Sequence, residues 1–297
     1  MTMQPEQGIR RELGLGENIS KTFEVYRREF AKYFVLFAIA GVIVQVATTL
    51  AQQAFVRPTL PVNPTSQQLS GYLSALFGAL FLLLAVIFVV NIVFSTIAEG
   101  SAIKLASEQI TKGQADLGPS VRFAVSKLLS IWALSIIVGI IVFLGFIALI
   151  VPGIILAIMY SIALPVLLIE NKGVTESMGR SRQLVSHRWG KTFGTFLVLG
   201  IIVLIASLIF GAITAPLGII LGPVANGILS AFYQPLFPIL MVVYYYSNLA
   251  RTAPPPPGQM PMGPIGTFQA EMKFCPTCGT QNASAATFCS KCGAKLN

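Results

Sequence analysis

Charge is scarce in this chain of 297 residues, and histidine is nearly absent. Only 10% of the residues are Asp, Glu, Lys or Arg, whereas 55% are apolar. Soluble domains carry about 25% charged residues, so this composition excludes an ordinary soluble globular protein. The mean hydropathy of +0.76 instead predicts an integral membrane protein.

The lack of histidine also limits the chemistry. A ligand or catalytic role for His187, the single histidine, requires partner side chains that the sequence does not supply. We therefore expect no enzymatic activity. Residues 1–32 contain neither the short apolar core nor the small-residue cleavage site of a secretory signal peptide, so none is expected.

Long windows without charge predict six transmembrane helices. A bilayer core requires roughly 20 apolar residues, about 1.5 Å each in a helix. The charge-free windows 128–169 and 192–250 are each long enough for two spans. The predicted spans cover about 33–56, 72–98, 129–151, 154–170, 192–214 and 224–247. They lie in a membrane domain from 20 to 250, after a polar segment, 1–19.

The basic residues predict an orientation. The N-terminal segment and the successive loops carry six, one, four, none, five and none, and the C-terminal tail carries four. This alternation follows the positive-inside rule, which places both termini in the cytosol of a plasma-membrane protein. Because the basic residues flank apolar runs, anionic lipid headgroups explain the net charge of +9 better than nucleic acid does.

A repeated pattern runs through the membrane domain. Short basic helices beginning at Ser20, Ser120 and Ser177 precede the odd-numbered spans, and their amphipathic character predicts a position in the lipid interface. The first of them is equally well explained as an extension of its span. Each even-numbered span ends in a polar pair: Glu99–Gly100, Glu170–Asn171 or Ser247–Asn248. This pattern predicts three pseudo-repeats.

Glu99 and Glu170 are the acidic residues that touch spans, and each has two explanations. The favoured one is an ion pair with a nearby Lys or Arg. The other is a headgroup or cation site shared between repeats, and Arg180, Arg182 and Arg188 are further candidates for headgroup contact. Deeper polar residues are interpreted as contacts between helices: Gln45, Asn91, Asn226 and Gln234.

The segment IALPVLLIENKGVTESMGRSRQLVSHRWGKTFG resembles the membrane domain named after glycerophosphoryl diester phosphodiesterases. That pattern is an apolar helix ending in Glu-Asn, then an Arg-Ser pair, and a Trp before the next span. The resemblance covers roughly Ser20 to Asn248. Some members of the family carry a soluble phosphodiesterase barrel, which requires histidines and carboxylates that this sequence lacks. The resemblance therefore implies no enzymatic activity here.

All four cysteines lie near the C-terminus, after a Pro- and Gly-rich linker, 251–271. Cys275 and Cys278 form one Cys-x-x-Cys knuckle and Cys289 and Cys292 a second, each followed by glycine. Such knuckles aim four thiolates at one point, which predicts a structural zinc site in a ribbon, 272–297, resembling minimal zinc ribbons. Disulfides are the alternative, but a reducing cytosol disfavours them.

The sequence thus predicts an all-α integral membrane protein with six transmembrane helices in three pseudo-repeats, amphipathic interfacial helices and a small β zinc ribbon. Two functions fit. The favoured one is a binding or scaffold role, in which the ribbon captures a cytosolic protein partner and needs an exposed docking patch. The alternative is lipid or solute handling by the helical bundle, which needs a polar cavity.

Overall fold

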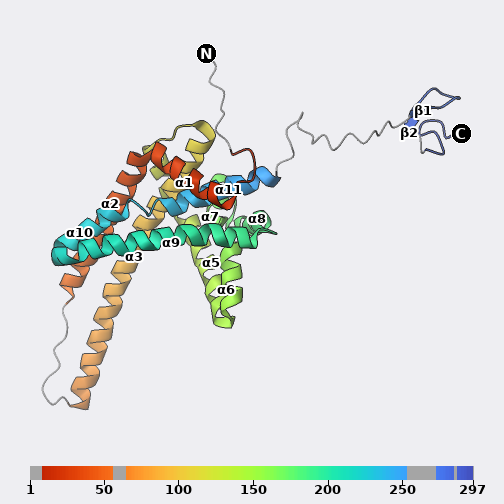
Figure 1. Cartoon of the computed structure of the whole chain (residues 1–297). Coiled ribbons are helices and arrows are strands. Elements are labelled where there is room, and N and C mark those ends of the chain that lie inside the picture. The colour runs from red at the N-terminus through yellow and green to blue at the C-terminus, as the bar shows by residue number, and fades with distance from the viewer. Residues whose placement is uncertain (1–8, 56–64, 253–271, 284–285, 297) are drawn as a thin grey trace. The chain divides into compact units, whose positions relative to one another are not determined.

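The computed structural model describes residues 9–55, 65–252, 272–283 and 286–296. The chain divides into two compact units, one ending at Thr252 and one beginning at Ala253 (Figure 1). The first is built from helices, and the second contains two short antiparallel strands, β1 (Met272–Phe274) and β2 (Gln281–Ala283). Of the predicted linker, residues 251 and 252 belong to the last helix, and 253–271 lie outside the described residues.

The helices of the first unit follow one another with short connections. They are α1 (Leu15–Arg28), α2 (Phe30–Ala54), α3 (Ser66–Lys112), α4 (Leu117–Ser126), α5 (Leu128–Ala148), α6 (Ile150–Met159), α7 (Ala163–Ile169), α8 (Val174–Val185), α9 (Trp189–Thr214), the 3-10 turn η1 (Ala215–Leu217), α10 (Gly218–Ser230) and α11 (Leu236–Thr252).

Five helical segments of the described chain are long and apolar enough to cross a membrane. They are Phe30–Ala54, Ser66–Lys112, Leu128–Ala148, Ile150–Ile169 and Trp189–Ser230. These segments fit the membrane-embedded protein that the composition predicts. They include the regions of the first five predicted spans, whereas the count of six stays a prediction.

The predicted sixth span, 224–247, is not one continuous helix. It is divided between α10 and α11, and the turn between these helices ends at Pro235. Proline has no N–H to donate to the carbonyl four residues earlier, so an α-helix breaks before it. The predicted fourth span is interrupted in the same way at 160–162, just before Pro165.

The second predicted span was expected to end at Glu99–Gly100, but the helix that contains it does not end there. α3 continues to Lys112 and ends only at Gly113, which has a left-handed φ of 79°. Gly100 serves packing instead, because a Cβ there would lie 3.1 Å from the Cβ of Ala124 on α4. α1 likewise begins at Leu15, before the expected Ser20.

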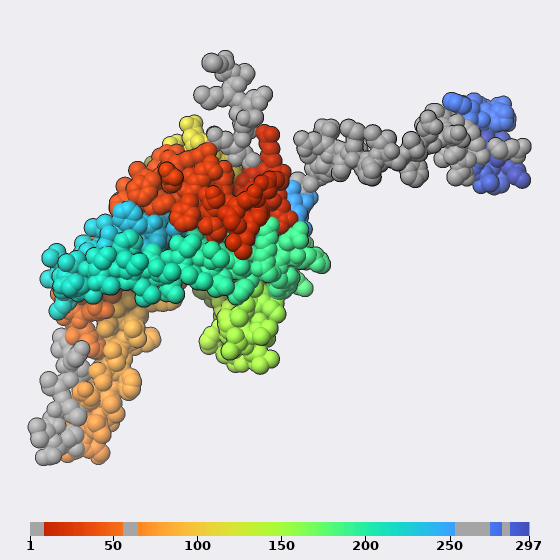
Figure 2. Space-filling view, viewed as in Figure 1, coloured from red at the N-terminus to blue at the C-terminus, as the bar shows by residue number. Residues whose placement is uncertain are grey.

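The packed core lies at the helix ends rather than along the apolar spans. At most 33% of the most apolar window of any candidate span is buried inside the protein. Figure 2 shows α9 and α10, coloured green to cyan, lying open along one face. The core is instead formed by α11, the second half of α3, α1 and the start of α2, with Tyr33 and Tyr244 fully buried.

Three short helices, α1, α4 and α8, each lead directly into a long apolar helix. They pack on α11, α3 and α7 respectively. Each has a fully buried polar residue in its first turn: Asn18, Ser120 or Ser177. In each case the side chain donates a hydrogen bond to the carbonyl four residues earlier, on Gly14, Asp116 or Gly173.

Candidate functional site

The two cysteine knuckles have the same backbone geometry. The Gly279 amide donates to the Cys275 carbonyl at 2.9 Å, and the Gly293 amide donates to the Cys289 carbonyl at 3.0 Å. Both glycines are left-handed, with φ of 70° and 71°, as the tight turns require. β1 and β2 extend from the first knuckle, with Phe274 paired to Gln281.

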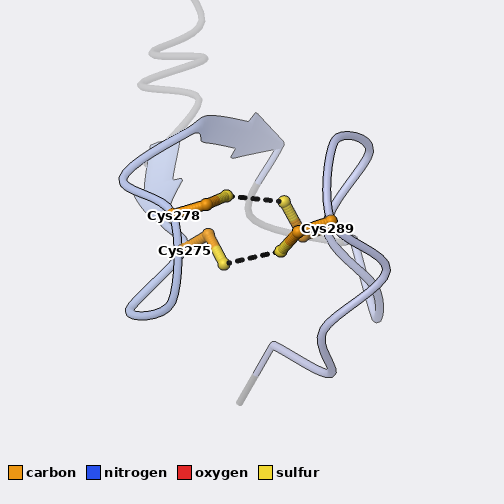
Figure 3. Close-up of side chains that lie close together, drawn as sticks. Cys275, Cys278 and Cys289 are labelled. Atoms are coloured by element: carbon orange, nitrogen blue, oxygen red, sulfur yellow. Dashed lines mark hydrogen bonds between the residues drawn. The ribbon is translucent and has the colours of Figure 1, made fainter.

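The four sulfur atoms converge on one point. Cys275 Sγ lies 3.6 Å from Cys292 Sγ, and Cys278 Sγ lies 3.6 Å from Cys289 Sγ (Figure 3). All four Sγ atoms lie within 4.8 Å of one another. A tetrahedral zinc with Zn–S bonds of about 2.3 Å needs sulfurs about 3.8 Å apart, whereas a disulfide needs about 2.05 Å. The cysteines therefore fit one metal ion.

The backbone of each knuckle favours the thiolate form of its first cysteine, and the thiolate is the form that binds metal. Hydrogen bonds from the backbone of Cys292 and Lys291 lower the pKa of Cys289 to about 6. Desolvation raises the pKa of Cys275, but hydrogen bonds from the backbone of Thr277 and Cys278 outweigh it and bring this pKa below its ordinary value. The first cysteine of each knuckle is thus prepared for the metal.

Comparison with protein families agrees with this geometry, because residues 274–296 match the model of the zinc-ribbon domain. The tail is a zinc ribbon. The match does not extend to the membrane part, and neither curated proteins nor solved structures provide a match for the chain. With four thiolate ligands the ribbon's metal site is closed, which is typical of structural zinc. Among the described residues of the ribbon, the buried cluster consists of Cys275, Cys289 and Leu296 with Ala286 and Ala294 packed against it, so zinc must supply much of the folding energy.

Glu170 joins three helices at one point. Its carboxylate pairs with Lys172 at 2.8 Å and with Arg180 of α8 at 3.3 Å. Tyr245 of α11 donates a hydrogen bond to it at 2.9 Å. Partial burial alone would raise the pKa of Glu170, but these three partners outweigh burial and lower it. The ion pair expected at this acid is therefore present.

Two of the three arginines predicted to contact lipid headgroups, Arg180 and Arg188, form ion pairs with acidic residues of the protein. Arg188 pairs with Glu12 at 2.9 Å, and Lys191 also pairs with Glu12. Of the three predicted arginines, only Arg182 is exposed. The apolar face of α8 is buried against protein, with Val185 1% exposed. Packing and ion pairs thus hold α8 in place, and headgroup contact stays a prediction for it.

Sequence reasoning missed Glu12, which lies in the segment interpreted only as polar. It contacts residues more than 170 positions away, and nothing local in the sequence indicates that. The segment around it belongs to the membrane unit, because the Leu13 amide donates to Ser247 Oγ at 2.8 Å. Burial raises the pKa of Glu12, but the hydrogen bonds and charges of Lys191 and Arg188 lower it by more, so the net shift is downward.

A cavity of about 420 Å³, lined by both polar and apolar residues, lies between α2, α3, α9, α10 and α11. Asn91, Ser95 and Glu99 line it at four-residue steps along one face of α3. Gln45 faces them from α2, and Gln234 and Ser230 from the other end of the chain. Three of the four deep polar residues interpreted as helix contacts, Gln45, Asn91 and Gln234, therefore surround one cavity.

Glu99 does not form the ion pair that was expected for it. Within the described residues, no hydrogen bond or salt bridge reaches its carboxylate, and no lysine, arginine or histidine lines the cavity. Glu99 is exposed and lines the cavity. The four-residue spacing of Asn91, Ser95 and Glu99 is the sequence signal that could have indicated this site.

Proposed function

We propose that this chain is a non-enzymatic, multi-pass membrane protein whose zinc ribbon captures a cytosolic protein partner. The observation that carries the proposal is a pair of exposed aromatic side chains on the ribbon. Phe274 is 64% exposed and Phe288 is 61% exposed. Each directly precedes the first cysteine of its knuckle.

Two large exposed aromatic residues are unusual for a domain of this size, since burying them would be the simplest way to enlarge its small core. Aromatic side chains are enriched where proteins bind one another, and they dominate the binding energy there. Because zinc holds both knuckles, the ribbon can keep these side chains outward. These two exposed side chains support the docking surface that a scaffold role requires.

The membrane unit would anchor the ribbon. The alternation of Lys and Arg along the chain supports six spans with both termini in the cytosol of a plasma-membrane protein, facing anionic headgroups. Three short helices with equivalent buried polar residues support three pseudo-repeats. The resemblance to the phosphodiesterase membrane domain stays a prediction, and the proposal uses no property of that family.

Photo-crosslinking tests the partner. A photoreactive amino acid replaces the exposed Thr277 in the full-length protein, which is then irradiated in intact cells. We expect one discrete protein adduct, lost in the double variant Phe274→Ser, Phe288→Ser and kept in the exposed control Lys291→Ser. Zinc content, measured on each purified variant, must stay at one per chain. An adduct that survives the double variant, or adducts to lipid alone, would overturn the proposal.

The second candidate function is lipid or solute handling by the membrane unit. The cavity around Glu99 is the specific observation that favours it, since ionisable residues within membrane domains commonly mark binding sites or pathways. The two functions do not exclude each other, because the ribbon and the membrane unit are separate compact units.

A further inference from the structure

The cavity between α2, α3, α9, α10 and α11 has a composition that selects one class of ligand. We propose that it binds the ammonium group of an amine-bearing amphiphile, with Glu99 as the counter-ion. This site is independent of the ribbon's proposed partner, so either proposal can fail without the other.

The charge of the cavity is the first argument. An ionised carboxylate removed from water is costly unless a cation or several hydrogen bonds compensate it. At Glu170 and Glu12, basic side chains provide that compensation. At Glu99 the described protein provides none, and the side chain lines a cavity of the membrane unit. A bound cation would therefore find an uncompensated carboxylate in this cavity.

The polar groups around Glu99 favour a bound cation with several donors. Asn91 and Ser95 lie on the same face of α3, over roughly 12 Å of helix between residues 91 and 99. Gln45 and Gln234 add amide oxygens from two other segments. An ammonium group has three N–H donors and no acceptor, so it matches a lining of carboxylate, amide and hydroxyl oxygens.

The apolar part of the lining indicates that the ligand is more than a bare ion. Phe37, Val203 and Phe237 form part of the wall. The volume of about 420 Å³ falls in the range typical of small-molecule sites, roughly 300–1,000 Å³. Hydrocarbon would contact this wall, and a phenyl face can attract an ammonium group directly. The ligand is therefore amphiphilic, and its source is either a membrane lipid with an amine headgroup or a soluble amine.

The test is calorimetric titration of the full-length, zinc-loaded protein in a nonionic detergent. The probe is hexylammonium, and the neutral comparison is hexanol, which has the same chain without the charge. We expect the wild-type protein to bind hexylammonium at least tenfold more tightly than the Glu99→Gln variant does. The matched control is Glu108→Gln on the same helix, where Lys104 and Lys112 already pair with the acid, and it should bind like wild type.

Competition identifies the source of the amine. Phosphatidylethanolamine added to the micelles should weaken hexylammonium binding if a lipid is the ligand, with phosphatidylglycerol as the control lipid. Free ethanolamine should weaken it if a soluble amine is the ligand. Either result supports the ammonium site.

Two results would overturn the proposal. One is equal binding of hexylammonium to wild type and Glu99→Gln, and the other is equal affinity of the wild type for hexanol and hexylammonium. Both would identify Glu99 as a neutral acid beside an apolar void. If Glu99→Gln does not fold, Asn91→Leu and Ser95→Ala replace it. Both variants should then weaken the binding of hexylammonium relative to that of hexanol, and an unchanged ratio of the two affinities would refute the site.

Discussion

At the crossing of α2 and α10, the position of one added methyl group decides whether a Gly→Ala substitution stabilises or destabilises the fold. A Cβ atom at Gly227 would lie 2.8 Å from the carbonyl carbon of Gly41 and 3.0 Å from the Val42 amide nitrogen. These are backbone atoms, so no flexible side chain can move aside. Ordinary contact begins at 3.4 Å, and Gly227→Ala must therefore push the two helices apart. Close approach through small residues is how membrane helices gain packing energy.

The magnitude follows from two opposing terms. Alanine gains about 1 kcal/mol over glycine in a helix, whereas overpacking costs about 1–3 kcal/mol. A clash between backbones belongs at the upper end, so we expect a net loss of about 2 kcal/mol. For a domain of this size that corresponds to a fall in Tm of about 4–8 °C. Thermal unfolding in nonionic detergent, followed by the helical circular dichroism signal, measures it.

The matched control is Gly211→Ala in α9. A Cβ there would meet no atom of the described residues within 4 Å, so only the helix gain remains. Its Tm should rise by about 2–4 °C. If Gly227→Ala were as stable as Gly211→Ala, the close crossing of α2 and α10 would be refuted.

Three further predictions concern separate contacts. Cys278→Ser should release the zinc and leave the ribbon open to protease, and metal analysis that still finds one zinc per chain would contradict this. Glu12→Gln should flatten the dependence of Tm on pH. Because the pKa of Glu12 is lowered in the folded protein, its ion pair with Arg188 stabilises the fold above pH about 4.5, and this stabilisation is lost on further acidification. Identical Tm profiles for the variant and the wild type would refute the ion pair. Tyr33→Phe should cost about 1–3 kcal/mol in the free energy of unfolding, because Gln109 Oε1 loses its buried donor; an unchanged Tm would exclude that bond.

Local features of the fold could be predicted from the sequence. The cysteine spacing predicts the whole ribbon site, because each knuckle is a four-residue turn whose geometry depends on its own glycine. The short helices α1, α4 and α8 could also be predicted, since charged residues next to apolar runs give a clear signal. Glycine can end a helix, or it can allow another helix to pack closely against its own. Gly100 was interpreted as a helix end, and only the packing of α4 against α3 shows that it has the second role.

Contacts between distant segments could not be predicted. The cavity combines residues of α2, α3, α9, α10 and α11 with Gln234 of the turn before α11, and its charge balance depends on the absence of basic residues from its lining. A single sequence gives no indication of such pairing. The same limit explains why Glu170 and Glu99 were treated alike, although one has three partners and the other has none among the described residues.

The three consecutive tyrosines of α11 explain how the membrane unit is held together. They are Tyr244, Tyr245 and Tyr246. Successive residues of a helix point about 100° apart, so three in a row can be bonded only if protein surrounds the helix. Their hydroxyl groups reach three different elements, bonding to Thr192 at 2.6 Å, Glu170 at 2.9 Å and Ser107 at 2.7 Å.

α11 therefore lies at the centre of the helix packing, and it is also the helix that leads to the ribbon. The chain leaves the membrane unit at Thr252, the last residue of that helix. Under the proposed function, a partner bound to the ribbon would pull on the helix that contacts α1, α3, α7, α8 and α9. Because the hydroxyl groups of its three tyrosines bond α11 to three other elements, a force applied at Thr252 would be distributed over several helices.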